Sequence, residues 1–124
     1  MKIRVYYEDT DAGGIVYHTN YIKYCERARS ELFFEREMMP AEDEASGFVV
    51  RKIQADFLST AKLGDILEVT TRFLQEKNTS ITLLQSVWKS EIKLFEMEIL
   101  LVYVFKGRPK RIPDNFRKLF DLYR

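Results

Sequence analysis

The sequence predicts an α+β fold in which a five-stranded antiparallel sheet packs one face on a long central helix. Three observations predict it: a strand pattern at the start of the chain, one long helical pattern, and then four further strand patterns in succession. Strands that follow one another at hairpin distances pair antiparallel, and their shared apolar face needs a helix to cover it. At 124 residues the chain is expected to form one domain, residues 1–124, that buries about two-thirds of its unfolded surface.

The first strand is expected at residues 2–7, where polar and apolar side chains alternate. An amphipathic helix follows over residues 21–38, because apolar side chains recur there at spacings of three and four residues. These apolar positions are Tyr21, Ile22, Cys25, Ala28, Leu32 and Phe33. Thr19 or Asn20 is the expected N-cap, and Pro40 stands where the helix has ended.

The remainder of the chain is mostly strand. The predicted strands cover residues 48–57, 66–74, 80–89 and 94–105. Short turns fit at residues 77–78 and 90–91, and Gly107 with Pro109 ends the last strand. Pro113 is expected to be the first residue of a short C-terminal helix, because proline suits that position.

The last predicted strand has two apolar faces, since every residue from Ile99 to Phe105 is apolar. The central helix can cover one of these faces. The other face needs either the closing helix or a second copy of the chain, because a large exposed apolar patch is unfavourable in water. A homo-oligomer is therefore expected.

Composition and charge narrow the range of partners. With 46% hydrophobic and 31% charged residues and a net charge of +1, the chain is typical of soluble globular proteins and is not expected to bind nucleic acid. Residues 106–118 carry six basic residues and one acid, whereas residues 26–44 carry seven acids and three arginines. Arg108 and Lys110 in the basic segment are candidates to bind a phosphate-bearing ligand, although a solvated charge run explains them nearly as well.

The sequence favours a cytoplasmic protein. Cys25 is the only cysteine, so no intrachain disulfide can form. The start of the chain is charged and lacks the apolar core of a signal peptide. The longest apolar run, residues 99–105, is far shorter than the ~18 residues of a spanning helix. Peripheral contact with the inner membrane stays open as an alternative.

Chemistry is expected in residues 9–21, which join the first strand to the helix. A carboxylate, a double glycine and a helix N-terminus lie close together there. Asp11 is the first candidate, as a general base toward water or as a nucleophile toward an acyl carbon. The alternative is that Asp11 only caps a turn, and Asp9 is a second acid that competes for the same role.

The glycines Gly13 and Gly14 allow a sharp turn into the helix, which would point the amides near Tyr17 and His18 outward at the positive end of the helix dipole. Such amides can hold an oxyanion, and one donor of this kind changes a rate by ~10²- to 10³-fold. The alternative is an ordinary helix start whose amides are satisfied by water or by Thr19.

His18 is the only histidine, which excludes a metal site built from several histidines, and neither a metal nor a redox cofactor is expected. Its ring is a candidate to orient a carbonyl group or to share a proton with Asp11. Cys25 follows on a similar helix face and is a rival nucleophile, but a buried small hydrophobic residue is the simpler interpretation.

The loop closely resembles the active-site signature of hotdog-fold acyl-CoA thioesterases over residues 7–21, which read YEDTDAGGIVYHTNY. The resemblance is to the YbgC-like group of the 4-hydroxybenzoyl-CoA thioesterase family, which is often encoded with the Tol-Pal envelope system. It continues through residues 26–29 and 48–52 and reaches Pro113, so it covers nearly the whole chain.

The resemblance implies a sheet wrapped around the helix, dimers that join their sheets edge to edge, and tetramers made from two dimers. It also implies that Asp11 is the catalytic aspartate, that the backbone amide of His18 is the oxyanion donor, and that the His18 ring belongs to the active site. In the family, the acyl group lies in a tunnel at the dimer interface and coenzyme A reaches basic surface residues. The expected substrate-binding residues here are Gly14, Tyr17, Thr60, Ala61, Arg108 and Lys110.

The chain departs from the subgroup at Thr60, because members commonly have proline before the alanine that corresponds to Ala61. This strand start borders the acyl pocket of the partner subunit in the family. Pocket shape and chain-length preference therefore do not carry over from the resemblance, whereas catalysis should.

The expected activity is hydrolysis of an acyl-CoA thioester to free acid and coenzyme A, with acyl carrier protein as an alternative donor. Two other functions stay open. A hotdog hydroxyacyl dehydratase is one, although the histidine-containing helix-entry motif of that group is missing here. The other is a non-catalytic module that binds acyl-CoA or acyl carrier protein, since one fold can support all three functions.

Overall fold

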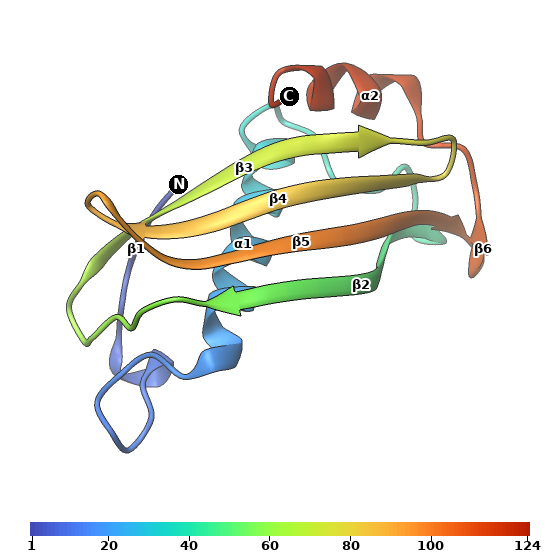
Figure 1. Cartoon of the computed structure of the whole chain (residues 1–124). Helices are drawn as coiled ribbons and strands as arrows, with labels where there is room; N and C mark the ends of the chain where they lie inside the picture. Colours follow the sequence, from blue (N-terminus) through green and yellow to red (C-terminus); the bar gives the residue numbers. More distant parts are fainter.

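A curved antiparallel sheet wraps around helix α1 (His18–Phe34) in the computed structural model, which describes all residues from 1 to 124 (Figure 1). The strands are β1 (Lys2–Arg4), β2 (Ser46–Phe57), β3 (Ile66–Glu76), β4 (Ser80–Lys89), β5 (Ile92–Phe105) and β6 (Arg108–Pro109). Five strands follow the order β1-β3-β4-β5-β2, and the short β6 pairs with the end of β5. A short helix α2 (Asp114–Asp121) lies near the C-terminus. The predicted α+β class, with its sheet around one long helix, is confirmed.

The first strand is shorter than predicted. Lys2–Arg4 pair with β3, but the chain then turns through a 3-10 helix at Tyr7–Asp9 instead of staying extended to Tyr7. The turn is held by the Asp9 carboxylate, which accepts a hydrogen bond from the Tyr6 amide at 2.9 Å. Tyr7, expected on the buried side of a strand, is consequently 81% exposed.

Helix α1 begins three residues earlier than predicted, at His18 instead of Tyr21. Its N-cap is Tyr17, whose side chain makes no capping hydrogen bond, so the predicted N-cap at Thr19 or Asn20 is wrong. The physical reason is a contact with a preceding segment of the chain, which holds the first turn in place of a side-chain cap and is described below with the site.

Helix α1 also ends earlier than the predicted Met38, at Phe34. Glu37 adopts a left-handed conformation with φ of 55°, and the Met38 amide donates to the carbonyl of Phe33 at 3.0 Å. A left-handed residue followed by such a hydrogen bond is a common way for a helix to end. Neither α1 nor α2 has the length and apolar character needed to cross a membrane.

The four later strands agree with the sequence prediction to within two residues at each end. The bounds of β4 are those predicted, and the tight turn after it places Ser90 at φ of 54°. One small difference concerns α2, in which Pro113 is the N-cap instead of the first helical residue. The turn at Lys77 is closed by its amide, which donates to the Ser80 carbonyl at 2.8 Å.

Helix α2 packs on the same side of the sheet as α1 and extends the core beyond the end of that helix. The ring of Phe33 in α1 meets Phe116 at 5.2 Å and Phe120 at 6.4 Å between centroids. Phe73 of β3 stacks on Phe120 at 4.5 Å. Since α2 joins the side that α1 already covers, it cannot cover the opposite face of the sheet.

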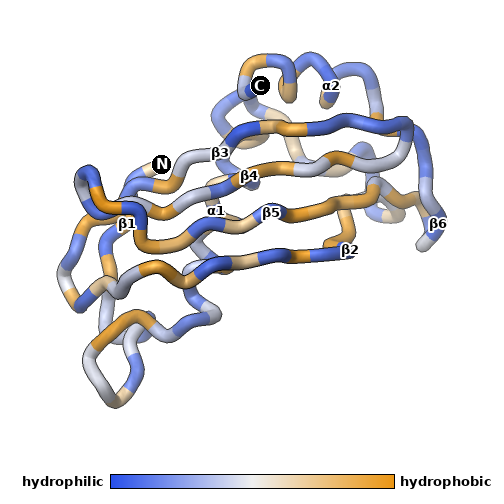
Figure 2. The backbone as a smooth tube through the Cα atoms, in the orientation of Figure 1, coloured by the Kyte–Doolittle hydropathy of each residue, from blue (hydrophilic) through white to orange (hydrophobic).

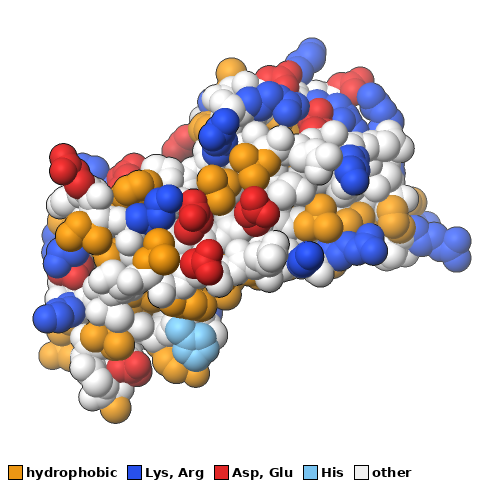
Figure 3. All heavy atoms as spheres, viewed as in Figure 1, with side chains coloured by type: hydrophobic (Ala, Val, Ile, Leu, Met, Phe, Trp, Pro, Cys, Tyr) orange, Lys and Arg blue, Asp and Glu red, His pale blue; other side chains and the backbone are white.

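The outer face of the sheet therefore stays open in the single chain. Leu100, Val102 and Val104 of β5 alternate with buried residues and are only half-buried, which places them on this face. Hydrophobic and hydrophilic positions alternate along the strands in Figure 2. The apolar positions share the face with acidic side chains, which gather near its middle in Figure 3.

The role of α2 in the core gives a first prediction. Phe120 is 1% exposed, and Phe120→Ala should lower the free energy of unfolding by about 3–5 kcal/mol, because it leaves a cavity among aromatic rings. Leu122→Ala is the control, since Leu122 is 62% exposed and should matter by less than about 0.5 kcal/mol. Urea unfolding of both variants measures the difference. Equal losses would show that α2 does not stabilise the core.

Candidate active site

The loop before α1 folds as a small hairpin that leans on the segment between β2 and β3. Thr10 pairs with Val16, and Ile15 pairs with Lys62, in two isolated bridges. The Gly14 amide donates to the Asp11 carbonyl at 3.0 Å. Gly14 has a φ of 79°, a left-handed conformation in which side chains other than glycine are strained. This position therefore explains one of the two glycines.

Asp11 lies exposed on this hairpin. Its Oδ1 atom accepts a hydrogen bond from the Gly13 amide at 2.8 Å, so the turn-capping role given above as an alternative is present. The other carboxylate oxygen accepts no hydrogen bond from the protein. A side chain on Gly13 would place its Cβ 3.2 Å from Oδ1, which explains the small residue there. Capping uses one oxygen of Asp11 and leaves the second available to water or an acyl group.

The first turn of α1 presents two backbone N–H groups that donate to nothing in the protein, those of His18 and Thr19. The flanking amides are engaged: Tyr17 donates to the Asp9 carbonyl and Asn20 to the Tyr17 carbonyl, each at 2.8 Å. Free N–H groups at the positive end of a helix dipole stabilise an anion. The backbone N–H of His18 can therefore donate a hydrogen bond to an anion and stabilise its charge.

Asp9 does not compete with Asp11 for a catalytic role, because it is buried and both of its carboxylate oxygens are occupied. Oδ1 accepts from the Asn20 side chain and Oδ2 from the Tyr6 amide, each at 2.9 Å. Together with its carbonyl bond to Tyr17, Asp9 joins the end of β1 to the start of α1. This contact is the reason why α1 needs no side-chain N-cap of its own.

Ala61 holds the other side of the loop. Its amide donates to the Tyr21 hydroxyl at 3.0 Å, and its carbonyl accepts from the Val16 amide at 2.9 Å. Burial is the main cause that raises the pKa of Tyr21, so the hydroxyl stays protonated. Ala61 is fully buried and anchors the hairpin through its backbone, whereas the neighbouring Thr60 is exposed.

The His18 ring is exposed and lies between two aromatic side chains. Its centroid is 4.5 Å from that of Tyr17, which is 46% exposed, and 6.1 Å from that of Phe57 at the end of β2. No hydrogen bond joins the ring to Asp11 in the structure, so the proton sharing considered from sequence is not seen. Phe57 was not singled out from sequence, because a strand-end phenylalanine has no local sign of contact with the loop.

Cys25 does not fit the role of a rival nucleophile. The side chain is fully buried, and burial raises the pKa of its thiol to about 12. The thiolate is the reactive form of cysteine, so a thiol that stays protonated at neutral pH is a poor nucleophile.

The basic candidates lie far from the loop within one chain. Arg108 is in β6, which pairs with the end of β5 at Phe105, whereas the loop lies near the pairing of Phe57 with Phe95. The stretch of β5 between residues 95 and 105 spans about 33 Å at 3.3 Å per residue. Basic side chains gather toward the β6 end in Figure 3, and Lys110 there pairs with Glu42 at 3.2 Å. A single chain therefore does not bring Arg108 and Lys110 to Asp11.

Comparison with known proteins identifies the family of this chain. Residues 13–96 match the thioesterase superfamily. The Helicobacter pylori protein named acyl-CoA thioesterase YbgC is 41% identical over 132 residues, covering 98% of each chain. The Escherichia coli O6:H1 protein named acyl-CoA thioester hydrolase YbgC is 41% identical over 120 residues, covering 91% of this chain and 88% of the relative.

A solved structure supports the same assignment. The probable thioesterase from Bartonella henselae superposes with a TM-score of 0.85 at 28% identity, covering 91% of this chain and 97% of the other. The sheet wrapped around one helix is thus the hotdog fold expected from the resemblance. The family match over more than half of the sequence, with relatives above 40% identity, shows that this chain belongs to the thioesterase superfamily.

Proposed function

We propose that the chain hydrolyses acyl-CoA thioesters to a free acid and coenzyme A, the type of reaction for which its curated relatives are named. The observation that carries the proposal is that one short loop presents two polar groups without partners in the protein. Asp11 presents a carboxylate oxygen without a protein partner, and His18 presents a backbone N–H without an acceptor. Hydrolysis of a thioester needs one group to activate the attacking oxygen and another to receive charge on the carbonyl oxygen.

In the proposed reaction, Asp11 acts as a general base. Water attacks the thioester carbon and gives a proton to the Asp11 carboxylate, while the carbonyl π electrons move onto oxygen. The N–H of His18 donates to that oxyanion, an interaction worth ~10²- to 10³-fold in rate for one donor. The tetrahedral intermediate then collapses, the C–S bond breaks, and the proton held by Asp11 passes to the coenzyme A thiolate.

Asp11 can also act as a nucleophile in a two-step variant of the same reaction. Its free oxygen attacks the acyl carbon, coenzyme A leaves as the thiol after taking a proton from solvent, and a mixed anhydride forms. Water then hydrolyses the anhydride and restores the carboxylate. Both variants use the same oxyanion donor and the same thioester, and an acyl carrier protein thioester carries the same reacting bond.

A second copy of the chain completes this proposal. Strand β2 pairs only with β5, so one edge of its twelve residues is unpaired. Four exposed apolar residues lie in this strand or directly after it, namely Val49, Val50, Phe57 and Leu58. A long apolar edge strand of this kind invites pairing with another strand. We propose that the occupant is β2 of a second copy, related by a twofold axis, with two such dimers meeting through their outer faces.

The twofold pairing also accounts for the distance between the loop and the basic segment. Antiparallel pairing of β2 with itself places the beginning of one strand beside the end of the other. Ser46 at the beginning of β2 pairs with Phe105, next to Arg108 and Lys110. Phe57 at the end of β2 contacts His18. The basic segment of one copy is therefore brought toward the catalytic loop of its partner, where it would bind the phosphates of coenzyme A.

The catalytic proposal predicts the effect of removing one charge. Asp11→Asn keeps the size of the side chain but removes the base, so kcat should fall by about 10²- to 10⁴-fold. Release of free thiol from a panel of acyl-CoAs measures it, with Glu8→Gln as the matched control at another exposed acid. Equal rates for wild type and Asp11→Asn would contradict the proposal. Tight acyl-CoA binding without thiol release would favour the non-catalytic module.

The dimer proposal predicts the effect of a charge on the β2 edge. Val50 is 46% exposed, and Val50→Lys would place like charges near each other across the twofold, raising the Kd of the dimer by about 100-fold or more. Leu74→Lys is the control, because Leu74 is 41% exposed but lies on β3, away from this edge. Analytical ultracentrifugation measures both. A wild-type chain that stays monomeric while turning over substrate would rule out the shared site.

A further inference from the structure

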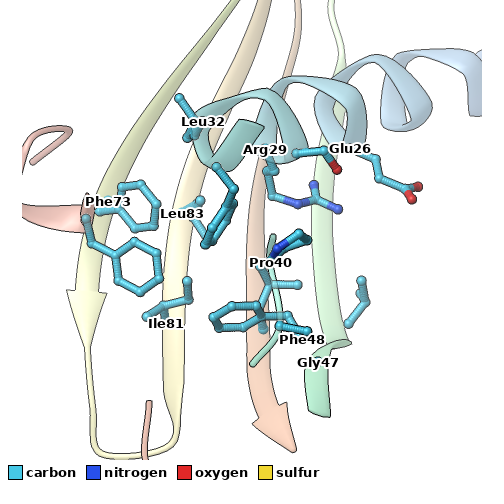
Figure 4. A pocket seen from close by; sticks show the side chains of 15 residues that line it. Glu26, Arg29, Leu32, Pro40, Gly47, Phe48, Phe73, Ile81 and Leu83 are labelled. Atoms are coloured by element: carbon cyan, nitrogen blue, oxygen red, sulfur yellow. The ribbon is translucent and has the colours of Figure 1, made fainter. Parts of the chain in front are cut away.

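A cavity of about 380 Å³ lies between the second half of α1 and the inner face of the sheet (Figure 4). Ten of its fifteen lining residues are hydrophobic. They include Leu32, Phe33, Phe48, Phe73, Leu83 and Leu101. Gly47 and Val50 line it from the beginning of β2, so the cavity adjoins the edge at which we propose that a second copy pairs.

The guanidinium of Arg29 enters this mostly apolar cavity. Figure 4 shows it directed from α1 into the space above Pro40. Its Nη1 donates to the Gln85 Oε1 atom at 2.9 Å. Gln85 is fully buried, and its own Nε2 donates to the Cys25 carbonyl and the Thr71 hydroxyl. Gln85 is thereby fixed in the core, and it fixes the orientation of Arg29.

Most N–H donors of the Arg29 guanidinium have no acceptor within the protein. The guanidinium has five N–H donors and makes a single hydrogen bond, and no carboxylate lies within ion-pair distance of it. Burial lowers the pKa of Arg29, which reports the loss of water around the charge, but an arginine stays protonated. The Arg29 side chain is only partly buried, and four of its five N–H donors have no acceptor in the protein.

Glu26 is the acid nearest in sequence that also lines the cavity. It is exposed, so water screens its charge, and it makes no ion pair with Arg29. The unpaired donors of Arg29 therefore face the interior of an apolar cavity with room for a ligand. A chain of methylene groups that ends in a carboxylate matches both features.

We propose that the cavity receives the acyl group of an ω-carboxyacyl thioester, with Arg29 donating to the terminal carboxylate. The inference rests on the proposed function and dimer. In one chain, His18 and Arg29 are eleven residues apart on α1, about 16 Å, which is farther than a six-carbon acyl chain reaches from the loop. Across the twofold, the cavity at the beginning of one β2 lies beside the loop at the end of the other. Arg29 is thus a specificity residue that acts on its partner's substrate.

The test compares two thioesters of equal carbon number, adipoyl-CoA and hexanoyl-CoA, in which a carboxylate replaces a methyl group. The wild-type chain should favour adipoyl-CoA in kcat/KM by about 10- to 100-fold, the effect expected of a charge-assisted hydrogen bond. Arg29→Met should abolish this ratio, and Arg29→Lys, which keeps the charge, should restore part of it. A ratio near one in the wild type, or a preference that survives Arg29→Met, would overturn the proposal.

Two further measurements test where the acyl group binds and whether the preference exists without turnover. Ser30→Leu adds bulk to the cavity wall beside Arg29 and should raise KM for both thioesters, and an unchanged KM would show that the acyl group lies elsewhere. Calorimetric titration of Asp11→Asn with both intact thioesters reads the preference without turnover. If the wild type hydrolyses neither thioester, the proposed reaction fails, while the titration still decides whether Arg29 selects the carboxylate.

Discussion

The site depends first on the buried side chain of Asp9. Its carboxylate and carbonyl oxygens accept three hydrogen bonds, from Tyr6, Tyr17 and Asn20. One residue thus joins the segment after β1 to the start of α1. An acid at the N-terminus of a helix is also favoured by the helix dipole. Asp9 accepts from the Tyr17 amide and from the Asn20 side chain, whereas the N–H groups of His18 and Thr19 have no acceptor in the protein.

The opposite side of the hairpin is fixed just as firmly by Ala61. Its backbone bonds to Tyr21 and Val16 join the loop to α1 and to the segment after β2. Asp11 is therefore an exposed residue held between two buried anchors. A carboxylate held in this way stays near one position without being desolvated, which suits a base that must meet water and a substrate.

The strands and the existence of the long helix could be predicted from sequence because they follow from local patterns. Alternation along β4 and three- and four-residue spacing along α1 are set by neighbouring residues. The start of α1 could not be predicted in the same way, since the bond from Asn20 to Asp9 joins residues eleven apart in different elements. The place of Arg29 at the cavity could not be predicted from local pattern either, although the family resemblance includes residues 26–29. In a helical pattern this arginine looks like a surface charge, and only the fold shows Gln85 beside it.

Strand β2 borders both the candidate catalytic loop and the cavity. Its end contacts the His18 ring through Phe57, and its beginning forms one wall of the cavity into which Arg29 projects. In one chain, the two ends of this strand are about 33 Å apart. In the proposed dimer, an antiparallel copy of the same strand brings the loop of each chain beside the cavity of the other. The proposed chemistry therefore uses the unpaired edge of β2.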